Sequence, residues 1–223
     1  MDIQNFIEDK INDLWDKYSR FEFTKFPPLA PKIINSKNTI LFIGLNPSLS
    51  KNEINRIQSN SITKAEFYSN HKNEKTIHKY FKKFIDISQK TNIEWEHIDL
   101  LYLRETRQRE ISNILKTQTG IDFVYEQLKI TEEILNRIFN EEKPKLVIVN
   151  NTLSRLFLGK DRNNWLNLDF NWNENIGTYE HKNIPFFFTS MLTGQRALDI
   201  GSYERLIWQI KQLKKRTPNN GYK

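Results

Sequence analysis

A short polar turn that directly follows an apolar run is the part of this sequence best suited to chemistry. The run Thr39–Leu45 is rich in branched residues and passes into Gly44-Leu45-Asn46-Pro47-Ser48. Gly44 has no side chain and lets a ligand approach the backbone closely. Asn46 offers both a hydrogen-bond donor and an acceptor, and Pro47 fixes the turn that carries it. By spacing alone, the same residues also fit an ordinary Asn-Pro turn.

Asp99 is a second candidate, because it is the only charged residue in the apolar run 98–103. An ionised carboxylate on a buried strand is costly unless it is paired, and Arg104 or Arg107 could supply that pair. The alternative is that the carboxylate accepts hydrogen bonds from an amino group of a ligand. The sequence is compatible with both interpretations.

Several common chemistries are excluded by what the sequence lacks. Without cysteine there are no disulfides, thiolate zinc sites, thiol nucleophiles or cysteine-bound iron–sulfur clusters. Gly44 lacks the partner glycines of a dinucleotide-binding loop, and no Gly-x-Ser-x-Gly motif is present. The four histidines are not spaced as metal ligands. We therefore expect no metal and no organic cofactor.

The elements that must position these residues follow from apolar spacing. A period of three to four predicts helices over 2–20, 77–88, 123–139 and 152–158, and a last helix that Ser202 caps. Short apolar runs predict strands over 39–45, 98–103, 145–149 and 184–189, and 167–181 fits a hairpin or loop. This alternation predicts a single α/β domain, 1–223, built as a three-layer sandwich around a central, mostly parallel sheet.

Two segments stand outside the alternation. Residues 1–31 comprise the N-terminal helix and a Pro-rich linker, and 48–75 form a polar insertion or lid. Ligands of open parallel sheets bind beyond the carboxyl ends of the strands. We expect the segments that follow these ends to converge: 44–48, 104–107, 150–152 and 190–199.

Basic charge is concentrated near the end of the sequence. The chain has 34 basic and 27 acidic residues, and the stretch 203–223 alone carries six basic residues and one acid. Such a stretch is either a solvated end or a phosphate-binding surface. No apolar run approaches the roughly 18 residues of a membrane helix, and no secretory signal is visible. We therefore expect a cytoplasmic monomer that does not contact membranes.

The apolar run followed by Gly44-Leu45-Asn46-Pro47 resembles the first motif of the uracil-DNA glycosylase superfamily, particularly its mismatch-specific and single-strand-selective branches. The resemblance covers strand and helix order from about 38 to 215. It implies a uracil-DNA glycosylase-like fold and a hydrolase that cleaves the N-glycosidic bond of an extruded, damaged or modified base in DNA. Asn46 would position the attacking water. The residues that would surround the base are Gly44, Pro47, Ser48 and the aromatic Tyr68, with Tyr80 and Phe81 as alternatives for stacking.

The sequence departs from the superfamily pattern in two places. Members usually follow the last strand with a His-Pro-Ser loop whose histidine supports the departing base, and residues 189–196 contain no histidine. Arg196 is our candidate for this role, with Gln195 and Thr193 behind it. Members that read uracil commonly have Asn where this chain has Asp99. A carboxylate matches an amino group such as cytosine N4 better than uracil O4, so we expect an amino-bearing or modified base.

DNA is the partner that the resemblance implies. Phosphate contacts are expected from basic residues beyond the second strand and in the last helix: Arg104, Arg107, Lys211, Lys214 and Lys215. Leu192 would either wedge into the duplex or anchor the core. Two other functions fit the same sequence. They are a catalytically inactive nucleic-acid-binding protein of the same fold, and a small-molecule hydrolase on a doubly wound α/β fold.

Overall fold

The computed structural model describes residues 3–32, 35–68, 79–160, 165–194 and 197–216, and for 3–6 and 214–216 the backbone alone. A six-stranded sheet has the order β4-β2-β5-β8-β7-β6. Its parallel strands are β4 (Trp95–Asp99), β2 (Ile40–Gly44), β5 (Leu146–Val149) and β8 (Ile184–Phe188). The strands β7 (Thr178–His181) and β6 (Asn171–Asn173) continue it as an antiparallel hairpin. The prediction of a mostly parallel sheet is confirmed.

Alternate side chains of the central strands face two separate hydrophobic layers. In β2, Leu41 and Ile43 belong to one cluster, whereas Ile40 and Phe42 belong to the other, and all four are fully buried. A strand that is covered on both faces needs apolar residues at every position. This explains why β2 reads as a continuous apolar run.

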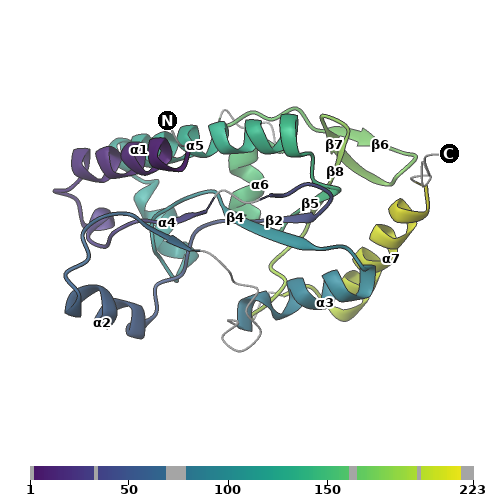
Figure 1. Cartoon of the computed structure of the whole chain (residues 1–223), viewed down its shortest axis with the longest axis horizontal. Helices are drawn as coiled ribbons and strands as arrows, with labels where there is room; N and C mark the ends of the chain where they lie inside the picture. Colours follow the sequence, from purple (N-terminus) through teal and green to yellow (C-terminus); the bar gives the residue numbers. More distant parts are fainter. Residues whose placement is uncertain (1–2, 33–34, 69–78, 161–164, 195–196, 217–223) are drawn as a thin grey trace.

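Helices cover both faces of the sheet. The cluster around Leu41 and Ile43 includes residues of α1 (Ile3–Lys17), α4 (Gln108–Ile114), α5 (Gln118–Arg137) and α6 (Thr152–Leu158). The cluster on the other face includes residues of α3 (Lys82–Thr91) and α7 (Ile200–Arg216). In Figure 1, α1 and α5 lie above the sheet, and α3 and α7 lie below it. The structure is thus an α/β fold with the layers that a three-layer sandwich requires.

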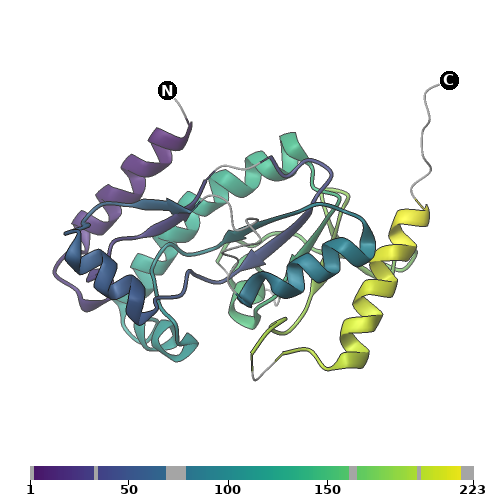
Figure 2. The same cartoon turned by 60° about the horizontal axis from the view of Figure 1, so that its bottom comes forward.

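The structure adds short elements where the sequence predicts irregular chain. The Pro-rich segment contains a 3₁₀ turn, η1 (Glu22–Thr24), and β1 (Leu29–Pro31). The described part of 48–75 contains α2 (Lys51–Ser59) and β3 (Glu66–Tyr68), and β3 pairs in parallel with β1. Strands of three residues are too short for periodicity to reveal. Figure 1 and Figure 2 both place α2 at the opposite end of the molecule from α7.

The strand predicted over 98–103 is wrong in its position, because β4 ends at Asp99. Residues 100–103 leave the sheet, yet all four are buried. The amides of Leu100 and Leu101 donate to the carbonyls of Gly44 and Leu45. Side chains of α5 satisfy further backbone groups: Oε1 of Gln127 accepts from the amides of Tyr102 and Leu103, and the Thr131 hydroxyl donates to the Leu100 carbonyl. A buried loop that is satisfied in this way has the apolar composition of a strand.

Helix ends also differ from the predictions. Residues 79–81 form a separate 3₁₀ turn, η2 (Lys79–Phe81), before α3, and α5 passes into a π-helical turn, η3 (Ile138–Glu142). Asp199 rather than Ser202 caps α7, because its Oδ1 accepts from the Ser202 amide at 2.9 Å. Within the described ranges, no helix combines the length and the apolar character needed to cross a bilayer.

Candidate functional site

Polar residues meet where β4, β2 and β5 end. Gly44 is the last residue of β2 and pairs with Asp99, the last residue of β4, and His97 lies two positions earlier on the same face of β4. Asn150 follows β5, and Tyr80 reaches these residues from η2. We call these five residues the strand-end cluster. The carboxyl ends of parallel strands are the edge at which α/β sheets bind ligands.

Gly44 makes room for the cluster. A Cβ atom at this position would lie 2.2 Å from Oδ1 of Asp99, 2.9 Å from Nε2 of His97 and 3.3 Å from the Tyr80 hydroxyl. No real Cβ tolerates the first of these distances. The carboxylate of Asp99 therefore occupies the space that any larger residue at position 44 would fill.

Asp99 and His97 form a buried pair. The two residues are 6% and 2% exposed, and Nε2 of His97 lies 3.5 Å from Oδ1 of Asp99. The pairing of Asp99 with Arg104 or Arg107 considered from the sequence is not formed: the neighbour of the Asp99 carboxylate is His97, and Arg104 pairs with Glu53 and Glu66. A buried carboxylate can hold a polar group of a ligand by accepting its hydrogen bonds.

Two phenols lie close to this carboxylate. Burial raises the pKa of Tyr80 above its ordinary value of 10, and the negative charge of Asp99 raises it further. The pKa of Tyr68 is raised by the same two causes in the same order. Both hydroxyls consequently keep their protons at neutral pH. The ring of Tyr68, the predicted stacking partner, lies 6.2 Å from that of His97 between centroids.

Asn150 joins the cluster through its side-chain amide. The residue is 2% exposed, and its Nδ2 donates to the Tyr80 hydroxyl at 3.0 Å. Its Oδ1 is buried and accepts no hydrogen bond from the part of the chain that the structure describes. Buried polar atoms are rarely left unpaired in folded proteins.

Asn46 fixes the turn that follows β2. Its Nδ2 donates to three backbone carbonyls, those of Glu105 at 2.7 Å, Pro47 at 2.9 Å and Leu103 at 3.3 Å. The bonds to Leu103 and Glu105 attach the turn to the connection between β4 and α4. They also orient the amide, so that Oδ1 is the atom of this half-buried side chain still able to accept a hydrogen bond.

A second pair of bonds holds the same two connections together. The Thr106 hydroxyl donates to the Leu49 carbonyl at 2.7 Å and accepts from the Leu49 amide at 3.1 Å. Of the predicted pocket residues in this turn, Pro47 is buried and Ser48 is exposed.

Arg104 takes part in an ion-pair group that attaches α2 to the fold. Its guanidinium, in a side chain only 1% exposed, donates to Glu53, to Glu66 and to the Pro27 carbonyl. Arg56 pairs with the same two carboxylates, at 2.9 Å from Glu53 and 2.6 Å from Glu66. Arg104 therefore has no exposed face to offer a phosphate, and Arg107 is the exposed arginine of this connection.

The remaining predicted residues lie after β8 and in α7. Leu192 is 2% exposed and packs with the cluster of α3 and α7, as the anchoring interpretation expects. Thr193 is half-buried, and Lys211 is exposed on α7. Gln195 and Arg196 lie outside the described residues, as do the side chains of Lys214 and Lys215.

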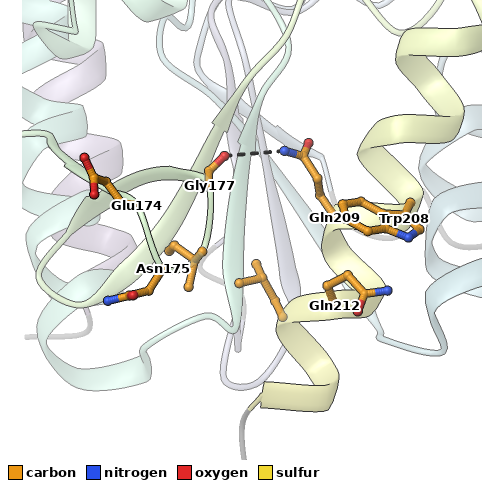
Figure 3. A pocket seen from close by; sticks show the side chains of 8 residues that line it. Glu174, Asn175, Gly177, Trp208, Gln209 and Gln212 are labelled. Carbon is orange, nitrogen blue, oxygen red and sulfur yellow. Dashed lines mark hydrogen bonds between the residues drawn. The ribbon is translucent and has the colours of Figure 1, made fainter.

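A separate open groove of about 260 Å³ lies between the turn of the β6–β7 hairpin and α7. Figure 3 shows Glu174, Asn175 and Gly177 on one side of it and Trp208, Gln209 and Gln212 on the other. Nε2 of Gln209 donates to the Gly177 carbonyl at 3.4 Å, and Trp208 is 60% exposed. These elements contribute none of the residues of the strand-end cluster.

The sequence predicted roles for Gly44, Asn46 and Asp99 and placed Asn150 in one of the converging segments, 150–152, but gave no role to the side chain of Asn150 or to His97. The available signal was positional, since Asn150 directly follows β5 and His97 lies two residues before the end of β4. In the described part of the chain, no three His, Asp or Glu side chains are grouped as metal ligands would be. Comparison of the sequence with protein-family models and with curated proteins finds no match to either.

Proposed function

We propose that the protein is a hydrolase of the DNA glycosylase type, which cleaves the N-glycosidic bond of an extruded base in DNA on a uracil-DNA glycosylase-like version of this fold. The observation that carries the proposal is the double role of Gly44. It belongs to the Gly44-Leu45-Asn46-Pro47 turn, which resembles the first motif of that superfamily, and it is also a member of the strand-end cluster, where it lies against Asp99. The turn that would hold the attacking water thus lies beside a buried carboxylate that would bind the base.

In the proposed reaction, a water oxygen forms a bond to the sugar C1′ while the bond from C1′ to the base nitrogen breaks. The electron pair of that bond leaves with the base, and the water loses a proton. Oδ1 of Asn46 would accept a hydrogen bond from this water, since Nδ2 is already directed at backbone carbonyls. Arg196, which lies outside the described residues, is the candidate for stabilising negative charge on the departing base.

Asp99 would hold the polar edge of the base, because a carboxylate only accepts hydrogen bonds. His97 lies 3.5 Å from its Oδ1 and limits the orientations that the carboxylate can take. Extruding a base costs a few kcal/mol of lost stacking and pairing, which contacts to the DNA backbone must offset. The exposed Arg107 and Lys211 are the described residues proposed for those contacts.

The direct test is abasic-site formation on single- and double-stranded oligonucleotides that carry one uracil, hypoxanthine, cytosine or modified cytosine. The wild-type protein is expected to release at least one of these bases. Asn46→Ala is expected to lower turnover by about a hundredfold or more while DNA affinity is retained.

Thr106→Val is the matched control for this variant. It removes the other side-chain bonds between the same two connections and leaves the water acceptor in place. If it lowers turnover as much as Asn46→Ala does, the effect comes from loosening of the turn and not from loss of the water contact. Turnover that is unchanged in Asn46→Ala contradicts the assigned role.

Each of the two alternative functions has its own result in this experiment. DNA binding without abasic product from any substrate indicates an inactive nucleic-acid-binding protein. No measurable DNA affinity at 50 mM salt indicates the small-molecule hydrolase, because phosphate contacts are strongest at low ionic strength.

A further inference from the structure

Oδ1 of Asn150 is a buried acceptor that no described residue satisfies. The Nδ2 atom of the same amide donates to the Tyr80 hydroxyl at 3.0 Å, in a residue that is 2% exposed. An unpaired buried acceptor lowers the stability of a fold. Its retention at a strand end therefore calls for an explanation by function.

The sheet order places this acceptor across from the carboxylate of Asp99. The strands β4 and β5 flank β2. Asp99 is the last residue of β4 and Asn150 directly follows β5, so the two residues lie on either side of Gly44. Neighbouring strands are about 4.8 Å apart, and the residue between the two acceptors has no side chain. Tyr80 lies beside Asn150 and the open position at Gly44, because its hydroxyl accepts from Asn150 and lies 3.3 Å from the position of a Cβ on Gly44.

We infer that Asn150 and Asp99 read the extruded base together, and that they select bases with an exocyclic amino group. The inference rests on the proposed function. Because Oδ1 of Asn150 and the carboxylate of Asp99 both accept, the bound group must supply at least two N–H donors. The amino group of cytosine, adenine or their modified forms carries two hydrogens. Uracil offers one ring N–H between two carbonyl oxygens, and hypoxanthine offers one ring N–H beside a single carbonyl oxygen, and such an oxygen would face the carboxylate.

The test measures binding separately from cleavage. The probes are thymine-only single strands with one central 2′-fluoroarabino nucleoside, whose glycosidic bond resists hydrolysis. The central base is cytosine, adenine, uracil or hypoxanthine, so the amino group under test is the only one in the probe. Fluorescence anisotropy gives the affinity of the wild-type protein and of Asn150→Leu, which keeps the approximate shape of the side chain and removes the acceptor together with the Nδ2 donor to Tyr80.

The wild-type protein is expected to bind the cytosine or adenine probe at least tenfold more tightly than the uracil and hypoxanthine probes. Asn150→Leu is expected to lose about tenfold in affinity for the amino-bearing probes and little for the others. A purely structural role for Asn150 would weaken all four probes equally. Ser154→Ala is the matched control, because it removes another buried oxygen without a described partner, on α6, and is expected to leave the preference unchanged.

Two results overturn the inference. One is a wild-type protein that binds the uracil or hypoxanthine probe at least as tightly as the amino-bearing probes, which needs no variant to observe. The other is an Asn150→Leu protein that folds, as shown by its circular dichroism, and keeps the wild-type preference. Neither result affects the proposed function if abasic product forms in the cleavage assay. Absence of both product and binding overturns the two together.

Discussion

A substitution at Gly44 tests the geometry of the strand-end cluster most directly. In Gly44→Ala the new Cβ would meet Oδ1 of Asp99 at 2.2 Å, so the carboxylate must move or the strand must shift. We expect the free energy of unfolding to fall by about 1 to 3 kcal/mol, as overpacking usually causes, and base binding to be lost. Urea denaturation and the anisotropy assay measure the two effects.

Gly201→Ala provides the comparison for this substitution. A Cβ there would meet Oδ1 of Asp199 at 3.3 Å, and Gly201 lies in the exposed first turn of α7. Alanine has a higher helix propensity than glycine, so the change in stability should be within about 1 kcal/mol of zero. Similar losses of stability in both variants would mean that the contact between a Cβ atom at position 44 and Asp99 is not the cause of the loss in Gly44→Ala.

Among the elements, the strands show best which boundaries can be predicted from the sequence and which cannot. The interior strands β2, β5 and β8 were predictable to within one or two residues, because cover on both faces demands continuous apolar runs. The strand β4 lies at the edge of the sheet and contains Glu96, His97 and Asp99, so its apolar signal is interrupted. The apolar residues that follow it belong to a loop satisfied by Gln127 of α5, a contact between distant segments that no local pattern reveals.

The attachment of α2 gives an acid-sensitive contribution to stability. Hydrogen bonds from Arg56, and then from Arg104, hold the pKa of Glu66 below its ordinary 4.5. The folded protein therefore binds this proton less readily than the unfolded chain does. The contribution is complete above pH 4.5 and is lost as the pH falls through the lowered value.

Glu66→Gln tests this contribution. We expect the variant to lose about 1 to 3 kcal/mol at pH 7, where charged hydrogen bonds are removed, and to show a shallower decline in unfolding free energy below pH 4.5 than the wild type. Urea denaturation between pH 3 and pH 7 measures both. Glu22→Gln serves as the control, because Glu22 and Lys25 form an exposed pair of small expected worth. An identical pH dependence for Glu66→Gln and wild type would contradict the account.

At the scale of the whole molecule, the charge of +7 is unevenly distributed along the chain. The exposed Lys211 lies on α7, and the exposed Arg107 precedes α4. If DNA is the partner, observed affinity should fall steeply as salt rises, because each neutralised phosphate releases a counterion.

Lys211→Gln should reduce the slope of log affinity against log salt by about one contact. The measurement is anisotropy with one oligonucleotide between 50 and 200 mM salt. Lys129→Gln is the charge-matched control, since Lys129 lies on α5 in the other helical layer and is paired with Glu132. A slope that changes equally in both variants would show that net charge, and not the surface of α7, sets the salt dependence.

Only those residues of the candidate site that stand out in the local sequence could be predicted. Gly44 and Asn46 could be singled out because they lie at and just after the end of an apolar run, and Asp99 because it is the one charged residue within the run 98–103. Asn150 lies across from Asp99 because the order in the sheet is β4-β2-β5. In the sequence β4 comes between β2 and β5, but in the sheet β2 lies between β4 and β5. Tertiary arrangement of this kind is not encoded in local spacing, so the pairing of two acceptors emerges only from the fold.

The sequence that encloses Asn46 also protects it chemically. Asparagine side chains age by attack of the following backbone nitrogen on the amide carbon, which forms a succinimide and then aspartate or isoaspartate. Pro47 has no hydrogen on its nitrogen, so that route is closed at this position. The side-chain nitrogen that grips three carbonyls should therefore survive long storage of the protein without conversion to an acid.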